Sequence, residues 1–372
     1  MRLRCRTTRP SDLDQCVAIA ADGCLYDRSA LVALRTMWLD LLVCDVARSA
    51  VVVKAESPER IVAFGIAAAV ERRRFDVLKA GCEPFVARRM VHEWCAGGKP
   101  FLNEQQYANA NAGDGVNVFA FPLGVNVDAV DTSDEETART VFVALVEAFG
   151  KQHAGLNVST FAQELFGWFP KLSRDAEPTI RFYDGTYEER IAQVPVDRRP
   201  FLLLKTRTEI ERQPTHAWAS TFLRPEAPRF AFKAELRRLL RHALEDESDD
   251  ALSDVLSLST AALKKRWLRI YEAMQSVLPS GAQQDCGRRG GESRRHVIRY
   301  LREHPEELHP YPSSCSNRPR SVALGKCEVE AGVYDVPQWS DPDEVRIRRR
   351  SLPHRAAHCA RHLQKAKKDQ PP

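Results

Sequence analysis

The residues best suited to chemistry are basic side chains spaced along one short stretch of the chain. Between residues 259 and 274, lysines and arginines alternate with apolar residues at helical spacing, so a helix here is apolar on one side and basic on the other. Exposed donors on one face of a helix can reach base edges and phosphates in the major groove of DNA. The polar or small positions off the apolar stripe are Thr260, Ala261, Lys264, Lys265, Arg266 and Arg269.

These positions belong to the last of three helices predicted within residues 232–274. The first helix has an apolar stripe that begins at Phe232. Ser248 or Asp249 can cap the second helix and Ser259 can cap the third, because their side-chain oxygens accept hydrogen bonds from the N–H groups of the first turn. A short second helix, a tight turn and a capped third helix form a helix-turn-helix, whose third helix enters the major groove.

This segment resembles the DNA-binding domain of LuxR-type regulators. The likeness covers residues 232–274 and lies in a D-x-x-L-S-D-V-L-S-L-S helix and turn, followed by a basic helix ending in R-I-Y. By position, the resemblance implies groove contacts at Lys264 and Lys265. It implies DNA-backbone contacts at Arg266 and Arg269.

The resemblance also implies a bacterial transcription regulator whose partners are double-stranded DNA and a second copy of the chain in a homodimer. We expect the N-terminal domain to sense a small-molecule effector or a partner. The turns differ from the family pattern. Where the family usually has Gly or Asn, this chain has Glu247 and Ser257, for which a left-handed backbone costs more than for glycine.

Other interpretations of the segment stay open. Region 4 of sigma factors has a similar pattern, although no other sigma region is visible upstream. A basic amphipathic helix can also be a solvated face or part of a protein-interaction module. A fourth helix is predicted to carry Val297, Ile298 and Leu301 and to end before His304. It would serve dimerisation or phosphate contact, or simply pack on the first helix.

The preceding part of the chain predicts a mixed α/β domain. Two helical runs are followed by two β-branched runs that predict an antiparallel hairpin, then by a buried strand, an acid-led helix and two more strands. Residues 71–115 are expected to form a long loop with one or two short helices. The predicted ranges are about 11–20 and 29–42 for the helical runs, 51–53 and 61–66 for the hairpin, 116–123 for the buried strand, 134–149 for the acid-led helix, and 179–183 and 201–204 for the last strands.

This order resembles the GNAT acetyltransferase-like fold, especially in R-P-S-D-L-D-Q-C and I-V-A-F-G-I-A-A-A-V. In that family a Q/R-x-x-G-x-G/A loop at a helix start holds the acyl-CoA pyrophosphate with backbone N–H groups. After Leu123 this chain has G-V-N-V-D-A-V-D-T-S-D-E-E, which lacks the glycines and would repel a pyrophosphate. We therefore expect a chain that is not an enzyme, with no catalytic residue and no cofactor. An N-acetyltransferase with an accessory helical domain is the alternative.

Length and composition complete the expected organisation. A chain of 372 residues predicts two folded domains. They are a GNAT-like domain at 1–205 and a helix-turn-helix domain at 232–312, joined by a proline-containing linker at 206–231. Residues 313–372 are expected to be a disordered basic tail. The net charge of +5 permits an anionic partner without requiring one.

Several site classes have no sequence signature. The ten cysteines include no C-x-x-C pair, which favours reduced thiols. His354, His358 and His362 lie near Cys359 at helical spacing, but without carboxylates nearby no metal site is expected. No G-x-S-x-G, P-loop, H-E-x-x-H or G-x-G-x-x-G motif is present. No apolar stretch reaches the roughly 20 residues of a membrane span, so a cytoplasmic protein without membrane contact is expected.

Overall fold

The computed structural model describes residues 3–22, 26–54, 59–80, 84–126, 128–130, 134–166, 180–181, 200–212, 226–245, 248–277 and 290–312. Met1–Pro319 forms one compact unit, and the second unit, Arg320–Pro372, lies outside the described residues. The predictions for the tail and for Glu247 therefore also lie outside them.

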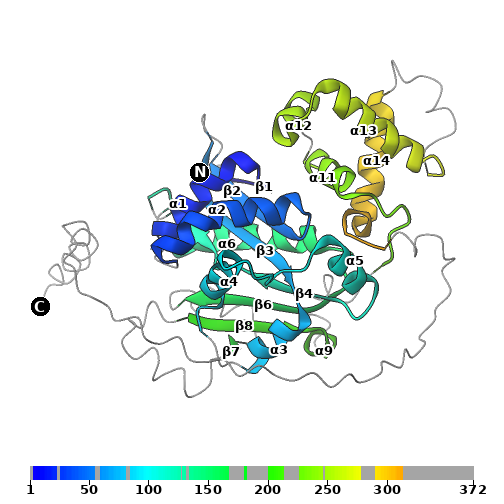
Figure 1. Ribbon diagram of the computed structural model, residues 1–372. Coiled ribbons are helices and arrows are strands. Elements are labelled where there is room, and N and C mark those ends of the chain that lie inside the picture. The colour runs from blue at the N-terminus through cyan, green and yellow to red at the C-terminus, as the bar shows by residue number, and fades with distance from the viewer. Residues whose placement is uncertain are drawn as a thin grey trace, which may run out of the picture. The chain divides into compact units, whose positions relative to one another are not determined.

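A mixed sheet forms the centre of the α/β part (Figure 1). Its strands run in the order β1-β2-β3-β4-β6-β8-β7, and β5 pairs with β3. All paired strands are antiparallel except β4 and β6, which are parallel and are joined through a helix. This confirms the expected mixed α/β class. The strands are β1 (Leu3–Thr7), β2 (Ala47–Lys54), β3 (Arg60–Val70), β4 (Val116–Ala120), β5 (Gly124–Val125), β6 (Val158–Phe166), β7 (Ile180–Arg181) and β8 (Pro200–Thr206).

The predicted hairpin is confirmed as β2 and β3. Successive side chains of a strand point to opposite faces of the sheet, and the valines of β2 follow this rule. Val51 and Val53 belong to the main hydrophobic core, whereas Val52 belongs to a smaller cluster with Val62. The sheet therefore buries an apolar layer on each face.

Helices cover both of these layers. The main core joins β2 to the helices after β1 and to α4, through side chains such as Trp38 and Met90. The smaller cluster joins β2 to α6 through Val141 and Leu145. The helices are α1 (Leu13–Asp22), α2 (Arg28–Val43), α4 (Val86–Cys95) and α6 (Glu135–His153).

The prediction of a long loop at 71–115 is wrong. This stretch forms α3 (Arg72–Ala80), α4 and α5 (Glu104–Ala112). The apolar periodicity of α5 is weak, but its start carries a capping box in which Asn103 and Gln106 bond each other's backbone N–H groups. That local signal was available in the sequence and was missed.

The helical part of the unit follows residue 226. It consists of α11 (Ala234–Ala243), α12 (Asp249–Leu256), α13 (Thr260–Ala273), α14 (Gly290–Glu303) and the 3-10 helix η4 (Pro305–Leu308). Its apolar side chains, among them Phe232, Trp267 and Val297, form a hydrophobic cluster of their own. Between the two parts, β8 and α9 (Arg207–Glu211) continue the α/β part into the predicted linker, and Ile210 lies in the main core.

Candidate nucleic-acid interface

Two capped helices joined by a tight turn form the candidate interface. The hydroxyl of Ser248 accepts a hydrogen bond from the N–H of Ala251 at 3.2 Å, which caps α12. The hydroxyl of Ser259 accepts one from Ala262 at 3.2 Å, which caps α13. Each cap satisfies an N–H that the helix itself leaves unpaired. Both helix starts lie where the sequence predicts them.

The turn between the helices places Ser257 in the left-handed region, at φ 51° and ψ 48°. The following N–H, of Leu258, bonds the carbonyl of Ser253 at 2.8 Å and closes the end of α12. A left-handed conformation costs a residue with a Cβ roughly 1–2 kcal/mol. Ser257 thus adopts the left-handed conformation, which is costlier for serine than for glycine.

We expect Ser257→Gly to raise the free energy of unfolding by about 0.5–1 kcal/mol, because glycine adopts this conformation without the steric cost. Urea unfolding followed by circular dichroism measures the change. Ser253→Gly, inside α12, is the matched control and is expected to lower the stability by about 0.5 kcal/mol. A loss of stability in Ser257→Gly would contradict the turn geometry.

The apolar side of α13 fixes which residues face solvent. Leu263, Trp267 and Ile270 are buried in the cluster of the helical part, together with Leu252 and Leu256 of α12. Because these positions recur at helical spacing, the side chains between them are turned outward. The exposed side of α13 is therefore set by its own packing.

Five of the six predicted contact residues lie on this exposed side: Thr260, Ala261, Lys264, Lys265 and Arg269. The sixth, Arg266, is half-buried, and its Nη1 is 3.5 Å from the carbonyl oxygen of Glu235 on α11. Burial lowers the pKa of its guanidinium. Arg266 thus contacts α11 and is not turned outward with the other five.

Leu268 belongs to the exposed side although sequence reasoning did not single it out. Leu268 is 45% exposed, which is high for a large apolar side chain. It follows Lys264 by one helical turn. An apolar side chain beside basic ones can contact the methyl group of thymine in a groove. The signal that could have found it is its spacing of four residues from Lys264.

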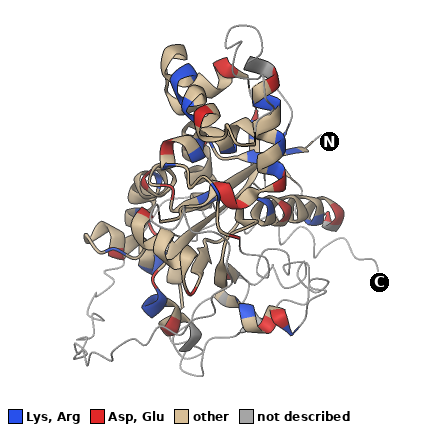
Figure 2. Ribbon diagram, turned by 90° about the vertical axis from the view of Figure 1, so that its right-hand side faces the viewer, with Lys and Arg blue, Asp and Glu red and all other residues tan. Residues whose placement is uncertain are grey.

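The helical part carries both basic and acidic residues (Figure 2). The N-terminal turn of α12 carries Asp249 and Asp250, which stabilise a helix start but repel phosphates. Asp249 is paired with Arg294 of α14 at 2.7 Å, and the guanidinium of Arg294 lies 5.0 Å from the ring centre of Trp267. Basic groups lie on α11, α13 and α14. Because Lys264, Lys265 and Arg269 are on the exposed side of α13, an approaching DNA backbone would be attracted to that side and repelled by the start of α12.

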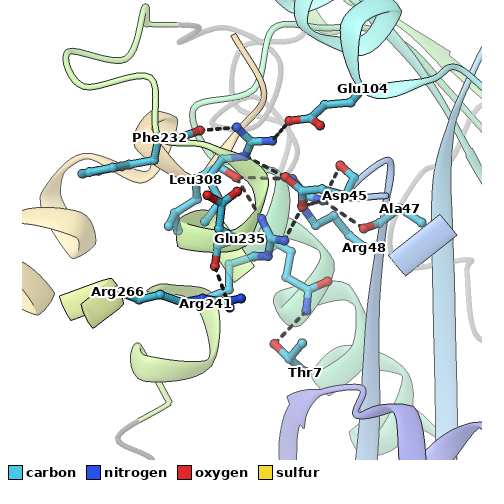
Figure 3. Close-up of polar contacts among 12 residues, drawn as sticks. Thr7, Asp45, Ala47, Arg48, Glu104, Phe232, Glu235, Arg241, Arg266 and Leu308 are labelled. Carbon is cyan, nitrogen blue, oxygen red and sulfur yellow. Dashed lines mark hydrogen bonds and ion pairs between the residues drawn. The ribbon is translucent and has the colours of Figure 1, made fainter. Parts of the chain in front are cut away.

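A buried ionic cluster joins α11 to the α/β part (Figure 3). Asp45, fully buried after α2, accepts hydrogen bonds from Arg237 Nε at 2.6 Å and from Arg48 Nη1 at 3.0 Å, and it also pairs with Arg241. Arg48 and Arg241 both donate to the carbonyl of Leu308. Although burial alone would raise the pKa of Asp45, its three guanidinium partners hold that pKa well below its usual range. The carboxylate is therefore ionised inside the protein.

The segment around η4 makes further contacts to both parts. The carboxylate of Glu307 accepts from the N–H groups of Arg229 and Phe230 at 2.7 and 3.0 Å. His309 Nε2 donates to the carbonyl of Ala154 at 2.8 Å. Beside it, a side chain on Gly155 would come within 2.6 Å of the backbone of this segment. The backbone of 304–311 is thus held closely against the α/β part.

Three buried histidines make the stability depend on pH. Burial lowers the pKa of His153 and of His242 to about 3, and that of His309 well below its ordinary value. The unfolded chain takes up protons near pH 6.5, whereas the folded chain does not until much lower pH. The free energy of unfolding is therefore expected to fall as the pH falls from about 6.5, by up to about 1.4 kcal/mol per pH unit for each histidine.

Urea unfolding at intervals between pH 7 and pH 5 tests this expectation, because most carboxylates titrate below that window. His309→Gln is expected to remove one of the three contributions to the slope while lowering the stability at pH 7. A stability that stays constant between pH 7 and pH 5 would contradict the burial of neutral histidines.

In the described part of the chain, no group of three or more His, Cys, Asp or Glu is arranged to hold a metal ion. None of the described helices is both long and apolar enough to cross a membrane. Cys5, Cys16, Cys44 and Cys95 are free thiols.

Comparison with known proteins identifies no family. No family model matches the chain, and no curated protein matches it. Among solved structures, mutant forms of the spermidine/spermine N-acetyltransferase from Vibrio cholerae match at 10% identity and a TM-score of 0.30, over 57% of this chain and 98% of that one. Our prediction that the chain is not an enzyme is contradicted by this neighbour, which is an acetyltransferase, and is withdrawn. A likeness of this size does not in turn assign an activity to the chain.

Proposed function

We propose that the protein is a DNA-binding transcription regulator and that α13 binds in the major groove. The observation that carries this proposal is the exposed basic side of α13, held by two serine-capped helix starts over a separate hydrophobic cluster. The helix needs no rearrangement to present Lys264 and Lys265, because both are already exposed. The major groove, about 12 Å wide, accommodates a helix of this kind.

The side chains along α13 differ in length and position, so each suits a different contact with DNA. Thr260 and Ala261 are short side chains in the first turn, so the start of the helix can approach the base edges closely. Lys264 and Lys265 are one turn further on and can donate to bases or phosphates. Arg269 lies one turn beyond Lys265 on the same side and suits a phosphate contact. The LuxR-like resemblance of this segment supports the same assignment.

The proposal includes a homodimer on DNA. Helix-turn-helix proteins commonly bind two half-sites as dimers, with the half-sites one helical turn or a multiple of it apart. Light scattering of the full chain with and without DNA measures the stoichiometry. Two chains per selected duplex, and a palindromic site, are the expected results.

Selection of DNA duplexes from a random library by the full chain tests the proposed function directly. Enrichment of one sequence over successive rounds is expected. The affinity for the enriched duplex should fall steeply with salt, because log K falls by about 0.9 per log unit of salt for each phosphate contact. Absence of any enriched sequence would contradict the proposal.

The acetyltransferase alternative has one structural observation in its favour. Among the described strands, β4 and β6 form the one parallel pair and are connected through α6, within an otherwise antiparallel order that suits a GNAT-like fold. The start of α6 carries the acidic residues Asp134 and Glu136, which oppose binding of a pyrophosphate at that helix end. Calorimetric titration of the full chain with acetyl-CoA separates the two candidates, and saturable binding would favour the enzyme.

A further inference from the structure

A small cleft lies between α11 and the strands β1 and β2. Its polar side is formed by Thr8, Arg48 and Ser49 of the α/β part and by Arg238 and His242 of α11, and apolar side chains of α2 close the other side. The cleft has a volume of about 40 Å³. Organic cofactors occupy sites of roughly 300 Å³ or more, whereas one water needs about 10–15 Å³. The cleft therefore accommodates a group of a few heavy atoms.

Two buried polar atoms of the cleft residues lack a hydrogen-bond partner within the described part of the chain. They are Nε of Arg48, whose side chain is almost fully buried, and Nδ1 of His242, whose residue is 9% exposed. Buried polar atoms of folded proteins are nearly always paired, so an unpaired donor beside a cleft indicates that a water or a ligand completes it. Burial and the neighbouring arginines lower the pKa of His242 to about 3, so this imidazole is neutral and can present an N–H at Nδ1.

Positive charge exceeds negative charge around the cleft. Asp45 is shared by three guanidiniums, and among the described residues Arg238 forms no ion pair. The carboxylate of Glu245 accepts a hydrogen bond from the N–H of Thr7, one of the cleft residues, at 2.5 Å. The pKa of Arg241 is lowered to about 9, mainly by burial and secondly by the positive charge of Arg48. This guanidinium is therefore still charged at neutral pH. An anion placed here would reduce the mutual repulsion of these arginines.

We propose that this cleft binds a small oxyanion, either inorganic phosphate or a short carboxylate. Arg238 supplies the charge, and Arg48 Nε and His242 Nδ1 supply hydrogen bonds that the protein itself leaves unmade. The anion would lie between α11 and the α/β part and would bind both. It would therefore stabilise their contact, since a ligand that binds only the folded state raises its stability. This site does not depend on whether α13 binds DNA.

Calorimetric titration of the full chain with inorganic phosphate, and separately with acetate, tests the proposal at constant ionic strength set by chloride. Saturable binding of at least one anion is expected, and the stronger of the two identifies the ligand class. Arg238→Gln should weaken that binding at least about tenfold, because it removes a charge-assisted hydrogen bond. Arg73→Gln on α3 makes the same charge change away from the cleft residues and should leave the binding unchanged.

A second variant tests the anion site while it keeps the charge of the ionic cluster around Asp45. Arg48→Lys keeps a positive charge beside Asp45 but removes the Nε–H, so it should also weaken anion binding. Absence of saturable binding by either anion, or equal binding by the native chain and Arg238→Gln, would overturn the proposal.

Discussion

Replacing Asp45 by asparagine is expected to lower the free energy of unfolding by about 3–5 kcal/mol, the usual cost of removing one partner from a buried ionic group. Asp45 is fully buried and is the common partner of Arg48, Arg237 and Arg241. Asparagine has nearly the same shape and tolerates the positive φ of 62° at this position. The expected loss therefore comes from the charge: three guanidiniums would be left in the interior without their shared carboxylate.

Asp14→Asn is the matched control for this prediction. Asp14 also pairs with an arginine, Arg35 at 2.6 Å, but the side chains are 70% and 44% exposed. Exposed pairs contribute at most about 1 kcal/mol. Urea unfolding of both variants at neutral pH measures the difference. Equal and small losses in the two variants would show that the cluster around Asp45 does not hold α11 to the α/β part.

The double variant Lys264→Ala with Lys265→Ala is expected to weaken binding to the selected DNA duplex by about 100-fold or more, since each contact to a base or phosphate contributes on the order of 1–3 kcal/mol. Both side chains are exposed, and within the described residues neither forms a hydrogen bond or an ion pair on which the fold depends. The helical circular dichroism signal should therefore not change. Fluorescence anisotropy with labelled DNA measures the affinity.

The control for this variant removes two basic residues elsewhere. The double variant Arg72→Ala with Arg73→Ala on α3 makes the same change of net charge. The affinity of this variant for the duplex should remain close to that of the native chain. If both double variants lose affinity equally, the attraction is a general effect of charge. If neither does, a surface other than α13 binds the DNA.

Local signals in the sequence were sufficient to predict the starts of α12 and α13 and the buried side of α13. Ser248 and Ser259 cap the helices that they were predicted to cap, and Leu263, Trp267 and Ile270 face the cluster that their spacing predicts. Such patterns depend only on residues within one or two turns. The same local reasoning failed for Arg266, because its position beside α11 is fixed by the angle between two helices.

The ionic cluster could not be predicted from the sequence. Asp45 is separated from Arg237 by 192 residues and from Arg241 by 196. Nothing near Asp45 in the sequence marks it as buried, and the arginines of α11 read as a solvated face. Only the packing of α11 on the α/β part brings these charges together.

Strand β6 was missed for a related reason. Its sequence includes Gln163 and Glu164, whose polar side chains argue against a buried strand, yet both are buried. Their burial is compensated by partners from elsewhere in the chain, and Gln163 Nε2 donates to the carbonyl of Phe121 at 3.4 Å. The carboxylate of Glu164 accepts from the N–H groups of Val86 and Ala87 at the start of α4. Long-range hydrogen bonds of this kind leave no periodic pattern to read.

The central claim is that α13 lies against DNA, and photo-crosslinking from Ala261 tests it most directly. Ala261 is exposed in the first turn of α13, so the photoreactive residue p-benzoylphenylalanine can replace it without filling the core. The full chain carrying this residue should form a covalent adduct with the selected duplex, and the crosslinked bases should lie within the enriched sequence. Binding of the duplex with no adduct from position 261, while the same residue in place of Arg73 on α3 does form one, would contradict the claim.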